Sequence, residues 1–396
     1  MTPGERRTLL ALLGFLTFAN VYASVVMAPV LTQVAAEFDV TPGTAGLAVA
    51  AFGAPGIVVA LLVGPYSDRL GRKRFLVTGS LVMGVFTLLS AFAATTFATL
   101  IAFRMIAGIG SAVIFPNTTA TVGDNIPYRE RGEAMSVVIG LNTLASVVGV
   151  PVAGIVAEAS TWRVSVGIVG ALSILAALVL HWRLQPAQMP LNEARIRELY
   201  RTIVTNRSAV AAIASSLLGA LYWFTWATYI VVFFEEIFDL SRGLASTVAL
   251  TQGLGILIGS QLGGRIGGRI GHKRVVAGSV AISGLILLLQ TNLTPPLMLT
   301  AVLNLALSAV IGARFASNTT LLSEQVPEAR GTLLALSASV TSLSIVVGAS
   351  LGGVLIDVFG FWALGVFCCV AALLAGLVVA LFVREEPIDL EIQPAA

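Results

Sequence analysis

Long apolar runs alternate along the chain with short polar or glycine-containing breaks. Each run has about 20 residues, the length that an α-helix needs to cross the hydrocarbon core of a bilayer. The pattern therefore predicts an all-α integral membrane protein with twelve transmembrane helices. We expect these helices at about residues 8–31, 44–66, 75–94, 97–120, 133–157, 162–183, 208–234, 244–266, 275–292, 297–320, 332–356 and 361–383.

One connection is longer and more polar than the others, and it divides the predicted helices into two groups of six. It covers residues 184–207 and contains Arg195, Arg197, Arg201 and Arg207. We therefore expect an N-terminal six-helix bundle at 1–183, a linker at 184–207 and a C-terminal six-helix bundle at 208–396.

The composition agrees with a membrane protein. Hydrophobic residues make up 57% of the chain and charged residues 11%, against about 25% charged residues in soluble proteins. The net charge of +3 does not indicate nucleic-acid binding, because the basic residues lie in short loops beside apolar runs. The two cysteines are adjacent, and no metal-binding spacing is present, so we expect no metal and no cofactor.

The basic residues predict an orientation. Most of the 23 Lys and Arg residues lie in the N-terminus, the even-numbered loops, the linker or the C-terminus, whereas Arg163 and Arg242 lie on the other side. Because loops rich in Lys and Arg stay in the cytoplasm, both termini and the linker are predicted to be cytoplasmic. The expected location is the inner (plasma) membrane.

An internal repeat relates the two halves. The only lysines, Lys73 and Lys273, occupy the same glycine-punctuated basic frame, at 64–74 and 264–274. The Gly154–Glu158 segment likewise matches Gly353–Asp357 in the second half. Two parallel six-helix repeats are the plan of a transporter with its substrate path between the halves.

With these marks, the chain resembles the major facilitator superfamily over nearly its full length. The 64–74 turn matches the loop 2–3 signature of that family, and the segment around Arg104 is similar to the span-four signature of its 12-span drug:proton antiporter branch. Val150 stands where that branch usually has glycine. An antiporter-like motif in span five comprises Gly140, Gly149, Pro151 and Gly154. The resemblance implies proton-coupled efflux of small hydrophobic or amphipathic compounds by alternating access.

The loop 2–3 turn is a candidate gating latch. Asp68 can accept hydrogen bonds at a helix start, which the resemblance places on span eleven, and Arg72 can pair with Asp124. Such links would hold the cytoplasmic side shut. The alternative is that the basic residues only set topology. The candidate latch consists of Gly64, Asp68, Arg69, Gly71, Arg72 and Asp124.

Two arginines lie inside predicted spans, where a charge is costly and is usually directed to a partner or a cavity. Arg104 has the uncharged Asn304 as its repeat counterpart. It is either a substrate contact, a group that controls a nearby proton site, or a structural tie to carbonyls of span one. Arg314 lies nearer the cytoplasmic end of span ten and can extend its head group to the interface.

Other polar and aromatic side chains are candidates for a central cavity. Tyr222, Trp226 and Tyr229 recur at helical spacing in span seven, with Trp223 beside them. We favour cavity lining for Tyr222 and Trp226. The alternative is packing between helices or an interfacial belt, and a belt explains Tyr229 better than it explains Tyr222. The uncharged candidates are Asn20, Tyr22, Asn117, Asn142, Gln252 and Asn304, with Asn20 and Asn142 favoured because spans one and five line the path in the resembled family.

Proton coupling rests on the resemblance, because none of the 20 acidic residues lies at mid-membrane. Glu158 and Asp357 lie near helix ends and are interpreted as caps or latches. Besides drug efflux, two alternatives stay open: a carrier of an organic anion that uses Arg104 and Arg314, and a non-transporting sensor. The sequence contains no nucleophile–base pair and no phosphate-binding loop that would indicate an enzyme. The expected partners are a small molecule, protons and the lipid bilayer, with no nucleic acid, for a monomeric protein.

Overall fold

A computed structural model describes residues 3–59, 62, 67, 70–127, 130–184, 196–326 and 330–385, and the described secondary structure is helical. Twelve helical segments are long and apolar enough to cross a membrane, which confirms the predicted number. They are Gly4–Phe38, Pro42–Val59, Arg72–Phe92, Phe97–Asn125, Glu133–Ala159, Trp162–Arg183, Arg207–Phe238, Arg242–Ile270, His272–Asn292, Leu297–Gln325, Thr332–Phe359 and Phe361–Phe382.

Several spans of the first half consist of more than one helix. The elements of this half are α1 (Pro3–Val25), η1 (Ala28–Val30), α2 (Leu31–Phe38), α3 (Pro42–Ala45), α4 (Leu47–Gly53), α6 (Arg72–Phe92), α7 (Phe97–Ala112), α8 (Ile114–Asn125), α9 (Arg131–Ala159) and α10 (Trp162–Arg183). Spans of the second half are single helices: α12 (Arg207–Phe238), α13 (Arg242–Ile270), α14 (His272–Asn292), α15 (Leu297–Gln325), α16 (Arg330–Phe359) and α17 (Phe361–Phe382).

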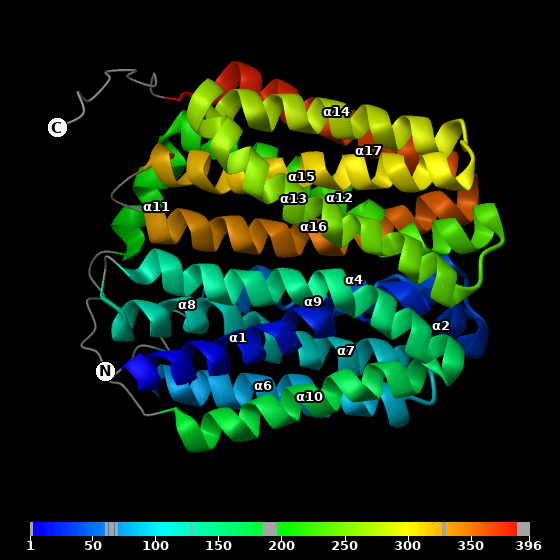
Figure 1. Cartoon of the computed structure of the whole chain (residues 1–396), viewed down its shortest axis with the longest axis horizontal. Coiled ribbons are helices and arrows are strands. Elements are labelled where there is room, and N and C mark those ends of the chain that lie inside the picture. The colour runs from blue at the N-terminus through cyan, green and yellow to red at the C-terminus, as the bar shows by residue number, and fades with distance from the viewer. Residues whose placement is uncertain are drawn as a thin grey trace.

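The two groups of six spans lie side by side with their helices running in a common direction (Figure 1). Both chain ends lie at the same end of the bundle, which we call the terminal face, and we call the other end the opposite face. Inside the expected linker, Ile196–Thr205 forms the short helix α11 at the terminal face. The halves meet where α9 packs on α13 and where α3 and α4 pack on α16.

Local backbone geometry repeats with the same offset of 200 residues as the sequence. Gly71 and Gly271 precede α6 and α14 with φ of 91° and 96°, a conformation that favours glycine because it has no Cβ. Asp39 and Asp239 end α2 and α12 in the left-handed region, with φ of 51° and 52°. The two halves are therefore structural repeats, as predicted.

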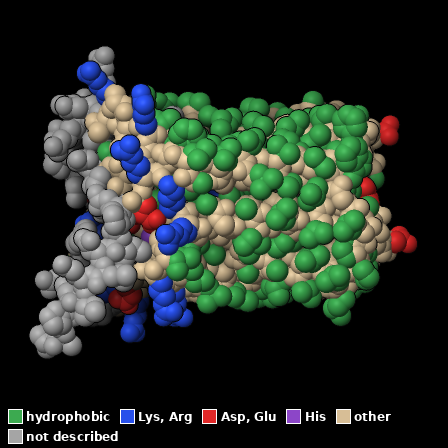
Figure 2. Space-filling view, turned by 90° about the horizontal axis from the view of Figure 1, so that it is seen from above, with side chains coloured by type: hydrophobic (Ala, Val, Ile, Leu, Met, Phe, Trp, Pro, Cys, Tyr) green, Lys and Arg blue, Asp and Glu red, His purple; other side chains and the backbone are tan. Residues whose placement is uncertain are grey.

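The surface is that of a multi-pass membrane protein. Hydrophobic side chains cover the body of the molecule, Lys and Arg gather toward the terminal face, and Asp and Glu stand out at the opposite face (Figure 2). Large apolar side chains such as Leu257, Ile282 and Leu377 are exposed on the helices, which is favourable only in contact with lipid.

Candidate functional site

A cavity of about 220 Å³ lies between the two halves. The first half contributes Val21 of α1 and residues of α9, and the second half contributes residues of α12, α13 and α15. The lining residues are Val21, Asn142, Thr143, Ser146, Val147, Trp223, Phe224, Gly253, Ile256 and Phe315. This composition, aromatic on one wall and hydroxyl- and amide-bearing on the other, suits a ligand with an apolar body and a few polar groups.

Two of the predicted cavity residues, Trp223 and Asn142, line this space from different halves. Trp223 packs edge-on against Phe315, with ring centroids 6.4 Å apart, and forms the aromatic wall. On the other side, the side-chain oxygen of Asn142 is buried and has no hydrogen-bond partner among the described residues. An unpaired buried amide is costly unless a ligand or water completes it.

The other uncharged candidates lie inside their own halves. Ser111 donates to Asn20 at 2.7 Å, and the Asn117 amide nitrogen donates to the carbonyl of Val113. The Tyr22 ring packs against Gly149 of α9. Gln252, next to Gly253 of the cavity wall, has an amide nitrogen without a partner among the described residues.

Unlike Trp223, the aromatic residues Tyr222 and Trp226 of span seven are buried within the second half and are not on the cavity wall. The Tyr222 hydroxyl lies 2.8 Å from Ser283 of α14. Trp226 donates to Asn304 at 3.2 Å, and Asn304 in turn donates to Thr251 at 2.8 Å. In this structure, packing between helices therefore describes Tyr222, Trp226 and Asn304 better than cavity lining.

Arg104 ties three helices of the first half together. Its guanidinium is fully buried and donates to the carbonyl oxygens of Ala48 at 3.3 Å and Ala23 at 3.2 Å. It also stacks on the Phe52 ring at 4.2 Å. The tie to span one is the structural alternative considered for this residue, and it is present.

Arg314 is placed differently from its expected position. Only 1% of the residue is exposed, so it does not extend to the interface and that expectation was wrong. Its Nε and Nη1 atoms have no hydrogen-bond partner among the described residues. The guanidinium lies against Gly219 of α12, where a Cβ atom would stand 2.0 Å from Nη2.

Two carboxylates join the halves at the opposite face in equivalent ways. Asp357 of α16 accepts hydrogen bonds from the Thr41 hydroxyl at 2.5 Å and the Gly43 backbone N–H at 3.1 Å. Glu158 of α9 accepts from the Ser241 hydroxyl at 3.3 Å and from the backbone N–H of Gly243. Each carboxylate thus binds N–H and hydroxyl groups at the start of a helix in the other half, where backbone donors lack partners within the helix.

We call these contacts, of Glu158 with Ser241 and Gly243 and of Asp357 with Thr41 and Gly43, the opposite-face closure. Further contacts between the halves strengthen it. The buried Tyr229 hydroxyl lies 3.0 Å from the carbonyl oxygen of Gly43 and 2.5 Å from that of Ala349. Tyr229 therefore packs between the halves, and the alternative of an interfacial belt does not describe it. Arg242 donates to Thr32 of the first half at 2.7 Å and pairs with Glu235 at 3.2 Å.

The sequence contains a signal for the opposite-face closure, although the closure was not predicted from it. Thr41 and Gly43 recur as Ser241 and Gly243 at the repeat offset of 200 residues. Glu158 and Asp357 also match each other in the repeat. Only the three-dimensional structure shows that these carboxylates bind the Thr41–Gly43 and Ser241–Gly243 segments.

The candidate latch at the terminal face is only partly within the described residues. Gly64, Asp68 and Arg69 lie outside them. The predicted pair of Arg72 with Asp124 is confirmed, at 2.8 Å. Both partners belong to the first half, on α6 and α8, so this ion pair does not itself bridge the halves.

The antiporter-like motif lies along α9, with Pro151 inside the helix. A Cβ atom on Gly149 would stand 2.8 Å from the Tyr22 ring, and one on Gly154 would stand 1.9 Å from the Ser246 hydroxyl of α13. Among the described residues, nothing lies within 4 Å of the corresponding position on Gly140. Gly154 is thus required where the two halves approach closely.

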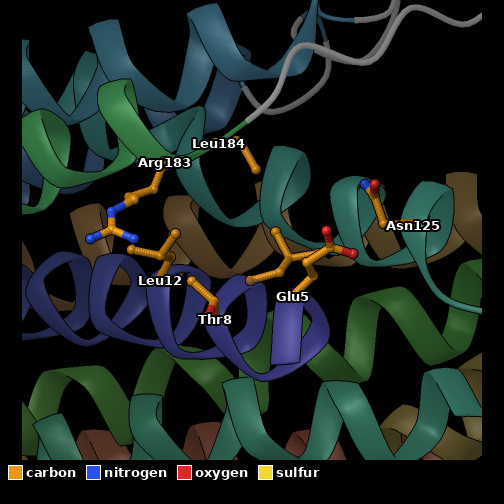
Figure 3. Close-up of a pocket in the computed structure, with 7 residues that line it drawn as sticks. Glu5, Thr8, Leu12, Asn125, Arg183 and Leu184 are labelled. Atoms are coloured by element: carbon orange, nitrogen blue, oxygen red, sulfur yellow. The ribbon is translucent and has the colours of Figure 1, made fainter. Parts of the chain in front are cut away.

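A second cavity, of about 460 Å³, opens near the terminal face. Figure 3 shows Leu12 and Thr8 of α1 on the side of Arg183, at the end of α10, and Glu5 of α1 on the side of Asn125 of α8. Its described lining residues belong to the first half and to Leu184 at the start of the linker, and none belongs to the second half.

Comparison with known proteins agrees with the repeat architecture. The family model described as Major Facilitator Superfamily matches residues 10–256 and 212–396. A solved bacterial homologue of the human lysosomal transporter Spinster, in an inward-facing and occupied conformation, has the same fold. The TM-score is 0.78 and the identity 16%, over 96% of this chain and 97% of the other.

Curated relatives match over different lengths. The uncharacterized MFS-type transporter YybF of Bacillus subtilis is 31% identical over 44% of this chain, a segment that covers 42% of that protein. The gentisate transporter of Corynebacterium glutamicum is 25% identical over 96% of this chain and 88% of its own. Multidrug resistance protein 2 of Bacillus subtilis is 22% identical over 89% of this chain and 90% of its own.

Proposed function

The chain belongs to the Major Facilitator Superfamily, a family of membrane transporters, and from this premise we propose that it moves small hydrophobic or amphipathic compounds by alternating access. The cavity between the halves is the substrate site. In this proposal the protein exports its substrate in exchange for protons, uses no cofactor, catalyses no covalent step and works as a monomer.

The observation that carries this proposal is the cavity together with the closure on one side of it. The hydrogen bonds that join the halves between described residues lie at the opposite face. Because Lys and Arg gather at the terminal face, we assign that face to the cytoplasm. In this proposal these hydrogen bonds close the outer side of the cavity.

The transition to the other state follows from the helix pairs between the halves. The α9–α13 pair and the contacts of α3 and α4 with α16 carry the interface. Rocking one half against the other would separate these helices at the opposite face, and the Glu158 and Asp357 contacts would break. Each neutral or charge-assisted hydrogen bond at such an exposed site contributes about 1 kcal/mol, so the closure is reversible.

The same two carboxylates are our candidates for proton coupling. Glu158 and Asp357 are acidic groups that connect the halves, and a protonated carboxyl is a weaker acceptor for backbone N–H groups. Protons from outside would therefore favour opening of the opposite face. Glu235, Glu236 and Arg242 are the neighbouring charged groups that would modify this effect.

The names of the full-length relatives span two substrate classes. One is a multidrug resistance protein and another is a gentisate transporter. Both classes contain compounds with an apolar ring, which agrees with the aromatic wall of Trp223, Phe224 and Phe315.

The test is transport by the purified protein in liposomes that contain a pH-sensitive dye. With a proton gradient imposed, lipophilic cations, neutral aromatic drugs and organic anions are added one class at a time. Proton movement that depends on an added compound supports exchange. Uptake of labelled compound without proton movement would support the proposed transport function and exclude proton coupling. Binding without any flux would indicate a sensor.

A further inference from the structure

Arg314 is a buried cation without a counter-ion in the described part of the chain. The residue is 1% exposed, and neither Nε nor Nη1 has a hydrogen-bond partner there. A charged group in a membrane interior is costly and is usually retained because it meets a partner. Arg104, equally buried, differs because it donates to two backbone carbonyl oxygens.

The position of Arg314 connects it to the central cavity. It directly precedes Phe315, whose ring lines the cavity, and its guanidinium carbon lies 5.6 Å from the centre of that ring. On α12, Gly219 contacts the guanidinium, and Trp223, one turn further along, lines the cavity. The side chain has several rotatable bonds, so the cation is within reach of a ligand that enters the cavity.

The volume and the lining of the cavity restrict the ligand. About 220 Å³ is less than the roughly 300–1,000 Å³ typical of sites for drug-sized molecules. The space therefore suits a compound with a single ring. Trp223, Phe224 and Phe315 provide aromatic faces and edges for that ring. Among the described lining residues, none is a carboxylate that would compete for the arginine.

We propose that this cavity takes a small aromatic carboxylate, with its ring among Trp223, Phe224 and Phe315 and its carboxylate paired with Arg314. This inference rests on the proposed transport function and narrows its substrate class from amphipathic compounds in general to single-ring anions. The carboxylate provides a charged acceptor for Nε or for Nη1, the two nitrogens that lack partners among the described residues. Asn142, on the opposite wall, is placed to bind a polar substituent of the ring.

The experiment compares benzoate with benzamide, which has the same ring and no charge. Binding is measured on the full chain in lipid nanodiscs, as the rise in unfolding temperature with ligand concentration. We expect benzoate, and not benzamide, to stabilise the wild-type protein. Arg314→Gln should weaken benzoate binding at least about tenfold, with partial retention in Arg314→Lys.

Two further variants separate recognition of the anion from general damage. Gly219→Ala keeps the charge but places a methyl group where the guanidinium now lies, so benzoate binding should weaken. Arg265→Gln removes an exposed arginine of α13 and should leave the affinity unchanged. If Arg314→Gln does not fold, the proposal is still tested by comparing benzoate with benzamide on the wild-type protein and on Gly219→Ala.

Equal stabilisation by benzoate and benzamide would overturn the proposal, and so would unchanged benzoate affinity in Arg314→Gln. Absence of benzoate binding to the wild-type protein would also overturn it. None of these results removes the proposed transport function, because flux of neutral amphipathic compounds is measured separately. Loss of all flux with intact benzoate binding would instead remove the transport function and keep the anion site.

Discussion

Glu158 and Asp357 occupy equivalent positions in the two repeats, and each binds the start of a helix in the other half. Glu158 accepts from Ser241 and the Gly243 N–H, and Asp357 accepts from Thr41 and the Gly43 N–H. The closure therefore has the approximate two-fold symmetry of the fold. Two equivalent links hold the opposite face on either side of the central cavity, and opening must break both.

Removal of one carboxylate should shift the protein toward opening of the opposite face. In Asp357→Asn or Glu158→Gln, loss of about 1 kcal/mol changes the open-to-closed ratio roughly fivefold. The double variant should show a larger shift, because the two links are separate. The measurement is the rate at which a thiol reagent that does not cross membranes labels Ser146→Cys in the cavity from the outside.

Asp39→Asn is the matched control for these variants. Asp39 is exposed at the same face, and its carboxylate forms no hydrogen bond to the second half within the described residues. The native Cys368 and Cys369 are buried, so background labelling should be low. Equal labelling of Ser146→Cys in all backgrounds would show that the two carboxylates do not hold the face closed.

A covalent link across the closure should stop transport. Thr41 and Asp357 lie in hydrogen-bonding contact across the interface, so cysteines at both positions can be joined by a short cross-linker that forms a disulfide with each thiol. We expect transport to fall to background after cross-linking and to return on reduction, because alternating access requires this contact to separate. Full transport by the cross-linked protein would contradict rocking of the halves about the cavity.

The repeat and the twelve spans were predictable because they depend on local properties. Apolar runs of the length of the bilayer core define the spans, and the 200-residue offset of Lys73 and Lys273 defines the repeat. Contacts such as Arg72 with Asp124 were also predictable, because each partner is a rare charge near a helix end.

Side-chain direction within a span was not predictable from helical spacing alone. Tyr222 and Trp226 share a face of α12, but this face turns toward α14 and α15 of the same half, where Ser283 and Asn304 provide partners. Trp223, the next residue, lines the cavity instead. Because both surfaces of the helix are apolar and buried, the hydrophobic pattern does not distinguish the cavity from the bundle interior.

The ion pair between Arg72 and Asp124 should contribute to the stability of the first half. Both side chains are mostly buried, at 16% and 12% exposure, so Asp124→Asn should lower the free energy of unfolding by about 1–2 kcal/mol. Exchange of the two charges in Arg72→Asp with Asp124→Arg should recover part of that loss. The check is thermal unfolding of each variant in the same detergent, and equal loss in the single and exchanged variants would exclude a direct pair.

The same substitution should impair the protein at one glycine of the antiporter-like motif and have no effect at another. Gly154 meets α13 so closely that a Cβ atom would stand 1.9 Å from the Ser246 hydroxyl, whereas the position on Gly140 is open. We therefore expect Gly154→Val to push α9 away from α13 and to prevent closure of the opposite face. Gly140→Val, on the same helix, should transport like the wild-type protein.

The measurement for this pair combines transport with outside labelling of Ser146→Cys. Gly154→Val should raise labelling and lower transport together, because both follow from failed closure. Combining Gly154→Val with Ser246→Gly should restore part of both, since it removes the side chain that the valine meets. If Gly154→Val lowers transport without raising labelling, the close approach of α9 and α13 serves packing alone and not closure.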